Sequence, residues 1–137
     1  MLKRDYLVKQ FEEFGKVMAI LLGLKSNGNY PDLLDEINKA AQKYTSTEIS
    51  FVELLPDEHL INELTREKKL NDDQLKMLGD LVFEKAEYYL KTGFPEKQAP
   101  NCYKKAYLIY SFLKEHATGN YSLDMHYKLE LLSKMNL

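Results

Sequence analysis

Residues 75–82, Leu-Lys-Met-Leu-Gly-Asp-Leu-Val, carry the pattern on which the fold prediction rests. Large apolar residues recur in this stretch at intervals of three and four, with Gly79 inside the run. That spacing places them on one face of an α-helix. The same arrangement occurs earlier, in residues 11–18, where the glycine is Gly15. The pattern therefore predicts that the chain uses one helical arrangement twice.

Features downstream of the two copies also correspond, at nearly constant offsets of 64, 66 and 67 residues. The pairs are Tyr30-Pro31 with Phe94-Pro95, Ala40 and Tyr44 with Ala106 and Tyr110, and an Asp-x-His-x-x-x-Glu-Leu pattern in residues 57–64 and 124–131. From this correspondence we predict two tandem three-helix units, residues 4–68 and 71–137.

The size and composition are those of one compact domain spanning residues 1–137. A chain of 137 residues and 16.0 kDa buries about two thirds of the surface that its unfolded form exposes. Hydrophobic residues make up 45% and charged residues 29% of the sequence, which is ordinary for a globular protein. No disulfide or metal is needed to stabilise a core of this size.

Charge and cysteine content narrow the class of protein. The net charge of −2 is evenly spread, so the basic surface typical of nucleic-acid binding is missing. The single cysteine, Cys102, cannot form an internal disulfide, and no secretion signal is recognisable, so we expect a cytoplasmic protein. The longest apolar run, residues 17–24, falls short of the ~20 residues that cross a bilayer.

The periodicity and the helix-boundary residues predict six helices and no strands, an all-α fold. Thr, Ser and β-branched residues make residues 45–50 the least helical stretch, so we expect a connector there, with at most one helical turn in residues 51–55. The predicted helices cover residues 4–25, 31–44, 56–68, 72–92, about 100–116 and 123–137.

The first predicted helix is apolar on more than one side. One face carries Leu7, Phe11, Phe14, Met18, Leu21 and Leu22, and a second flank carries Val17, Ile20 and Leu24. Such a helix lies either at the centre of a core or against a partner subunit. The pattern leaves open whether it is the core helix of a monomer or the contact of a homodimer.

The two matched glycines require an explanation, because glycine inside a helix costs roughly 0.5 to 1 kcal/mol relative to alanine. Close approach of the following helix is the natural one. We predict that Gly79 packs against Ala106, and that Gly15 packs against Ala40.

These residues resemble the tetratricopeptide repeat, whose first helix carries Trp-x-x-Leu-Gly-x-x-Tyr and whose second carries Ala-x-x-x-Phe. The resemblance implies a stack of helical hairpins. The start of the chain, residues 1–15, is also similar to small all-helical bacterial proteins, which implies a cytoplasmic origin. The positions that match the tetratricopeptide pattern are Leu75, Leu78, Gly79, Val82, Ala106 and Tyr110, and in the earlier copy Phe11, Phe14, Gly15, Met18, Ala40 and Tyr44.

The sequence offers little for catalysis, since it has no phosphate-binding loop, metal-type cysteine spacing or nucleophile motif. One arrangement is a candidate metal site. His59 and Glu63 share a helix face, as do His126 and Glu130, so two packed units could bring both pairs to one divalent transition metal. The alternative is that each pair is a solvated surface interaction.

Tyrosine is concentrated in the second half of the chain, and it suits both helix boundaries and partner-binding grooves. We expect one or two of Tyr88, Tyr103 and Tyr107 to face outward into such a groove.

Cys102 lies near a helix start, where thiolates are favoured, but a packed and unreactive thiol is the preferred interpretation.

The favoured function is therefore that of a non-catalytic helical-repeat module, without cofactor, that binds a protein or peptide on the surface of the fourth and fifth helices. Two alternatives remain open at this stage. One is a metal-dependent helical protein or enzyme that uses His59, Glu63, His126 and Glu130. The other is a dimeric structural or regulatory subunit that associates through its first helix.

Overall fold

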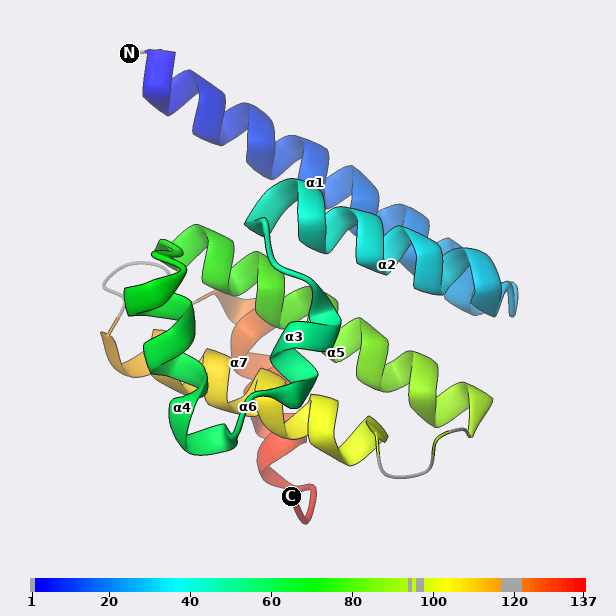
Figure 1. The fold of residues 1–137 in the computed structure, drawn as a ribbon. Helices are drawn as coiled ribbons and strands as arrows, with labels where there is room; N and C mark the ends of the chain where they lie inside the picture. Colours follow the sequence, from blue (N-terminus) through cyan, green and yellow to red (C-terminus); the bar gives the residue numbers. More distant parts are fainter. Residues whose placement is uncertain (1, 94, 96–97, 117–121) are drawn as a thin grey trace.

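The structure, a computed structural model, describes residues 2–93, 95, 98–116 and 122–137 (Figure 1). This part of the chain is helical and contains no strand, which confirms the all-α class. The elements are α1 (Leu2–Ser26), α2 (Tyr30–Thr45), α3 (Ile49–Leu54), α4 (Asp57–Asn62), a π-helical turn η1 (Glu63–Glu67), α5 (Asp72–Thr92), α6 (Gln98–His116) and α7 (Leu123–Ser133).

The described residues form seven α-helices where six were predicted, because the expected connector contains α3. Ile49 and Val52 of α3 are buried, so a short helical turn is stabilised by tertiary packing despite weak helix propensity. The third predicted helix is also divided, since α4 continues as the π-helical turn that buries Leu64. The predicted tandem relationship of two three-helix units stays a prediction.

The helix boundaries follow the capping residues of the sequence. Asn71 begins α5 with a capping box, in which its side chain and that of Gln74 each bond to the other's backbone amide. Gly93 ends α5 in the left-handed conformation, and Ser122 caps α7. The start of α6 differs from the prediction, because the helix begins two residues before Pro100, which a first helical turn tolerates. The predicted stop at residues 117–120 lies outside the described residues.

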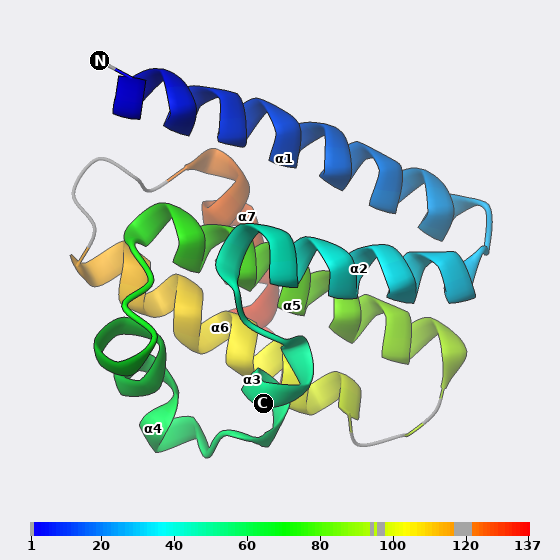
Figure 2. The same ribbon diagram turned by 45° about the horizontal axis from the view of Figure 1, so that its top comes forward.

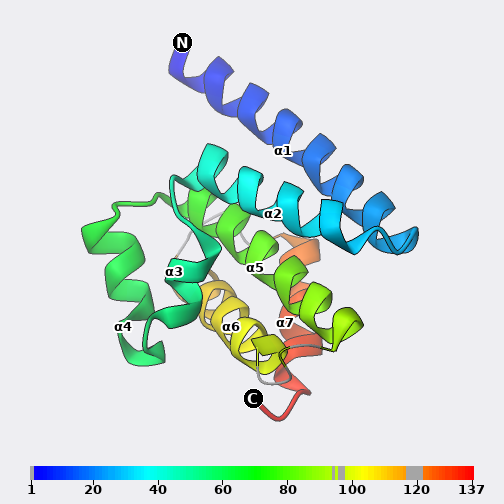
Figure 3. The ribbon, with the colours of Figure 1, turned by 45° about the vertical axis from the view of Figure 1, so that its right-hand side comes forward.

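Helix α5 is the centre of the molecule. All of its residues from 77 to 86 are buried, so the helix is enclosed on every side along this stretch. It packs closely against α6 and also against α2, while α7 covers α6 and α1 lies outside α2 (Figures 2 and 3).

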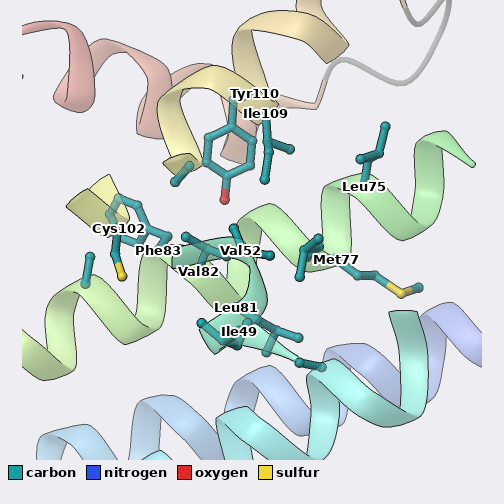
Figure 4. Close-up of a cluster of buried hydrophobic side chains, with 14 of the residues drawn as sticks. Ile49, Val52, Leu75, Met77, Leu81, Val82, Phe83, Cys102, Ile109 and Tyr110 are labelled. Atoms are coloured by element: carbon teal, nitrogen blue, oxygen red, sulfur yellow. The ribbon is translucent and has the colours of Figure 1, made fainter. Parts of the chain in front are cut away.

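The matched glycines occupy different environments. A Cβ atom at Gly79 would lie 2.9 Å from Cε1 of Tyr110 and 3.2 Å from Cγ2 of Ile109. Figure 4 shows these two α6 side chains beside α5. The predicted close approach at Gly79 therefore exists, although its partners are one turn from Ala106. The prediction for Gly15 is wrong, because no atom lies within 4 Å of its Cβ position and Ala40 is not its neighbour.

Helix α1 is peripheral, so of the two alternatives that the sequence left open, a central core helix does not hold for this fold. Its buried side chains include Phe14 and Leu21, but Phe11, Ile20 and Leu22 are 46%, 54% and 50% exposed. They are exposed because α5 already occupies the centre of the fold, and α1 packs mainly on α2.

We expect Gly79→Leu to lower the melting temperature by several degrees. The new side chain would meet the Tyr110 ring, which is fully buried and cannot move aside, and overpacking of this kind costs about 1 to 3 kcal/mol. Thermal denaturation followed by circular dichroism measures the change. Gly23→Ala is the control, because no atom lies within 4 Å of its Cβ position, and we expect it to leave stability unchanged or slightly raised. An unchanged melting temperature in Gly79→Leu would contradict the packing.

Candidate functional site: a cleft beside the first helix

A cleft of about 690 Å³ lies between α1, α5 and α7. Its volume is in the range of known ligand pockets, and it is open along one side. One wall is apolar and is provided mainly by α1, and the other is charged and is provided by α5 and α7. The described apolar lining consists of Phe11, Phe14, Gly15, Met18, Leu22, Met77 and Leu113, and the polar lining of Asp72, Asp73, Lys76, Asp80, Glu84, Ser122, Asp124 and Lys128.

The charged wall is organised around Asp80, whose side chain is almost completely buried. Its carboxylate accepts a hydrogen bond of 2.6 Å from the Tyr110 hydroxyl. It also accepts one of 2.7 Å from Nζ of Lys76 and one of 3.2 Å from Nζ of Lys128. One carboxylate thus links α5 to both α6 and α7. Burial, followed by the negative charge of Asp80, raises the pKa of Tyr110 well above its ordinary value, so the hydroxyl remains a donor.

Asp124 adds a second carboxylate at the mouth of the cleft. It accepts a hydrogen bond of 3.0 Å from Lys76 and lies 3.4 Å from Nζ of Lys128. Burial alone would raise the pKa of Asp124, but the charges of Lys128 and Lys76 outweigh it and lower the pKa. Burial alone would lower the pKa of Lys76, and the charges of Asp80 and Asp124 instead raise it. The positive charges of the two lysines and the negative charges of the two aspartates therefore balance.

A second charged group includes Glu84, which also lines the cleft. Nζ of Lys25, at the end of α1, lies 2.9 Å from a carboxylate oxygen of the buried Glu84 and 3.6 Å from one of Glu87. Glu87 in turn accepts a hydrogen bond from the hydroxyl of Tyr103. This ion pair fixes the C-terminal end of α1 to α5.

The arrangement suits binding better than proton transfer. Asp80 accepts hydrogen bonds from three donors, one of which is the Tyr110 hydroxyl, so both groups are already engaged within the protein. The buried charges compensate one another and shape a rigid wall. The apolar wall on α1 faces them across open space.

The charged wall of the cleft also carries negative charge that Lys76 and Lys128 do not neutralise. Asp72 and Asp73, in the first turn of α5, have no lysine or arginine partner among the described residues. Burial, followed by the charge of Asp72, raises the pKa of Asp73. Among the described lining residues, five carboxylates face two lysines. The cleft is therefore an acidic, half-apolar site.

The predicted metal site is not formed. His59 lies in α4 and Glu63 in the π-helical turn, and His126 and Glu130 lie in α7. Nε2 of His126 is 3.5 Å from Glu130, so this pair interacts locally. No group of three or more metal-type ligands occurs in the described part of the chain. The described side chains of the two pairs therefore do not converge on one metal, as the sequence pattern had suggested.

The predicted partner-binding tyrosines are less accessible than expected. Tyr103 is 4% exposed and its hydroxyl is bonded to Glu87, whereas Tyr88 and Tyr107 are half-buried. Their role in partner binding stays a prediction. Cys102 is buried, as predicted for a packed thiol, and burial, followed by the charge of Glu53, raises its pKa to about 12.

Sequence reasoning missed Lys76, Asp80 and Lys128. A usable signal was present, because Lys76 and Asp80 are four residues apart, as are Asp124 and Lys128, and both pairs have opposite charges. Spacing of this kind predicts a pair on one helix face. It does not show that the two pairs meet.

No known protein family, curated protein or solved structure matches this chain. The resemblance to the tetratricopeptide repeat accordingly stays a prediction that rests on residues alone. Within the described ranges, no helix combines the length and the apolar character needed to cross a membrane.

We expect Asp80→Ala to lower the free energy of unfolding by about 3 kcal/mol, because it leaves a buried hydroxyl and two partly buried lysines without their shared acceptor. Urea denaturation measures the loss. Asp35→Ala is the matched control, since its pair with Lys39 is solvent-exposed, and it should change stability by less than about 0.5 kcal/mol. Equal effects of the two substitutions would show that the network adds nothing specific.

The lowered pKa of Asp124 gives its contribution a defined pH dependence. A carboxyl group with a lowered folded-state pKa stabilises the protein above its ordinary value of 3.8, and the effect is lost as the pH falls through the folded-state pKa. We expect Asp124→Asn to destabilise by under about 1 kcal/mol near pH 7, because the side chain is 56% exposed. In urea denaturation the difference from the unmodified protein should shrink as the pH falls below 3.8 and be lost once the pH has fallen through the lowered folded-state pKa. A difference that grows with acidity would contradict the ion pairs.

Proposed function

We propose that this protein is a non-catalytic module that binds an amphipathic helix of a protein partner in the cleft between α1, α5 and α7. The observation that supports this most directly is the pairing of one apolar wall with one acidic wall along the same open groove. A helix with an apolar face and a basic face matches both walls. Helix-in-groove binding is a common mode of peptide recognition.

The exposed apolar surface supports the same proposal. Phe11 and Leu22 are about half exposed on the cleft side of α1, although both are large and apolar. Apolar side chains gathered along a groove mark interaction sites more often than isolated ones do. Covering them would remove apolar area from water, which is the main favourable contribution to association.

Charge supports a basic partner rather than an acidic one. Asp72 and Asp73 lack a cation partner among the described residues, and Asp124 is exposed at the mouth of the cleft. Lysine or arginine side chains on the partner would approach these carboxylates at the rim. Contacts of this kind determine specificity and the rate of association more than the affinity.

This proposal moves the binding surface away from the outer face of α5 and α6. Tyr103 is buried there and its hydroxyl is already bonded, so it cannot act as an exposed anchor. The kind of partner, a protein or peptide, is the same as the sequence indicated. The tandem-repeat architecture remains part of the proposal, since stacked helical hairpins commonly present such grooves.

We expect a fluorescent helical peptide of about 18 residues, made of leucine on one face and lysine on the other, to bind with a dissociation constant on the order of 1 μM. The matched peptide with glutamate in place of lysine should bind at least tenfold more weakly. Fluorescence anisotropy at low protein concentration measures both. Higher ionic strength should weaken the lysine peptide, because the rim charges are exposed.

Two variants on α1 locate the binding site. Met18→Glu places a charge on the apolar wall and should weaken the lysine peptide at least tenfold. Ile20→Glu is the control, because Ile20 is exposed on α1 but does not line the cleft. Equal affinity for the two peptides, or an equal effect of the two variants, would refute the proposal.

A further inference from the structure

The cleft-facing residues of α1 follow the spacing of a helix-pairing seam. Phe11, Gly15, Met18 and Leu22 all line the cleft, and Val8 extends the row toward the N-terminus. Successive members are three, four, three and four residues apart. This is the spacing by which one helix pairs with another along its length. The row therefore indicates that the cleft receives a helix rather than a compact ligand.

Gly15 lies at the centre of this row, and no contact with the described residues accounts for it. Outside its own helical turn, none of their atoms lies within 4 Å of the position that its Cβ would occupy. Glycine in the middle of a helix is unfavourable, so a glycine facing empty space on an apolar seam indicates a neighbour that is not part of this chain. A helix backbone could approach closely at this point.

The row is nearly symmetric about Gly15. Val8 lies seven residues before it and Leu22 seven after, and Phe11 lies four before and Met18 three after. An antiparallel copy of the same helix would place Val8 opposite Leu22, Phe11 opposite Met18, and glycine opposite glycine. Each contact would then occur twice, as a twofold interface requires.

The charge and the length of α1 fit the same arrangement. The helix carries five lysines and arginines against three acidic residues, and the cleft lining carries five carboxylates against two lysines. The last turn of α2 contacts α1 at Glu13 and Phe14, where Lys43 lies 4.0 Å from Glu13 and the Tyr44 ring packs on that of Phe14. Figure 1 shows that the N-terminal part of α1 extends past the end of α2.

We propose that the helix bound in the cleft is α1 of a second copy of this chain, which lies antiparallel along α1 and crosses it at Gly15. This inference rests on the proposed helix-binding function of the cleft and names the partner. The dimer buries the seam of both copies, and the basic α1 of each copy lies against the acidic wall of the other.

Sedimentation equilibrium of the full chain tests the association. We expect a mass about twice the 16.0 kDa of one chain at micromolar concentrations. Leu22→Glu should raise the dissociation constant of the dimer at least tenfold, because Leu22 is on the seam. Ile20→Glu should not change it, because Ile20 is equally exposed but lies on the opposite side of the helix.

Crosslinking tests the crossing point itself. Gly15→Cys should form a disulfide-linked dimer under mild oxidation, and Ile20→Cys should not. The native Cys102 is buried and does not interfere. Circular dichroism of each variant shows whether it is folded.

A monomer at all concentrations would overturn the inference, and binding of the lysine peptide by that monomer would leave the proposed function standing. A dimer insensitive to Leu22→Glu and not crosslinked through Gly15→Cys would overturn it as well. Such a dimer would place the interface elsewhere, for example on the exposed ridge of Leu123, Tyr127 and Leu131 on α7.

Discussion

The hydrogen bonds to the Asp80 carboxylate are the contact on which the rest of the structure depends. A buried carboxylate is costly unless its oxygens are bonded, and here three donors from α5, α6 and α7 satisfy them. Because the Tyr110 hydroxyl donates to Asp80, its ring lies against the backbone of Gly79, and α5 and α6 pack closely there. The same carboxylate also fixes α7, whose Lys128 reaches it. The charged wall of the cleft follows from this one requirement.

The carboxylates of Glu53 in α3 and Asp57 in α4 are likewise held by donors from neighbouring helices. Nζ of Lys85 lies 2.5 Å from a carboxylate oxygen of Glu53, and the hydroxyl of Tyr89 bonds the other oxygen at 3.0 Å. Nζ of the buried Lys105 lies 2.5 Å from Asp57. These pairs attach α3 and α4, which are too short to be stable alone, to α5 and α6. Buried ion pairs add little net stability but penalise wrong partners, so their role here is to select one arrangement of short helices.

The helices themselves were largely predictable because their signals are local. Asn71, Gly93 and Ser122 mark boundaries by the conformations that they favour, and these boundaries are confirmed. Periodicity identifies the faces of a helix but not what each face contacts. Phe11 and Leu22 belong to an apolar face and are nevertheless exposed, because α5 rather than α1 occupies the centre.

The site was less predictable for a related reason. The pairing of Asp80 with Lys128 joins residues 48 positions apart, and no local pattern encodes it. The repeated Asp-x-His-x-x-x-Glu pattern was instead misleading. In α7 it forms one continuous helix, but in the first half the helix changes to a π-helical turn at Glu63. Identical spacing in sequence thus gave two different geometries, and Asp124 joined the lysines of the cleft instead of a metal site.

Gly79 in α5 and Gly15 in α1 differ in whether a neighbouring helix packs against them. The spacing around Gly79 and Gly15 is the same, and at Gly79 the open space is filled by Tyr110 and Ile109 of the neighbouring helix. At Gly15 no side chain of the described residues enters that space, and the apolar residues beside it line a cleft. This difference between two helices with the same packing pattern is the reason for proposing a partner outside the chain. The symmetry of the row about Gly15 is the reason for proposing that this partner is a second copy of α1.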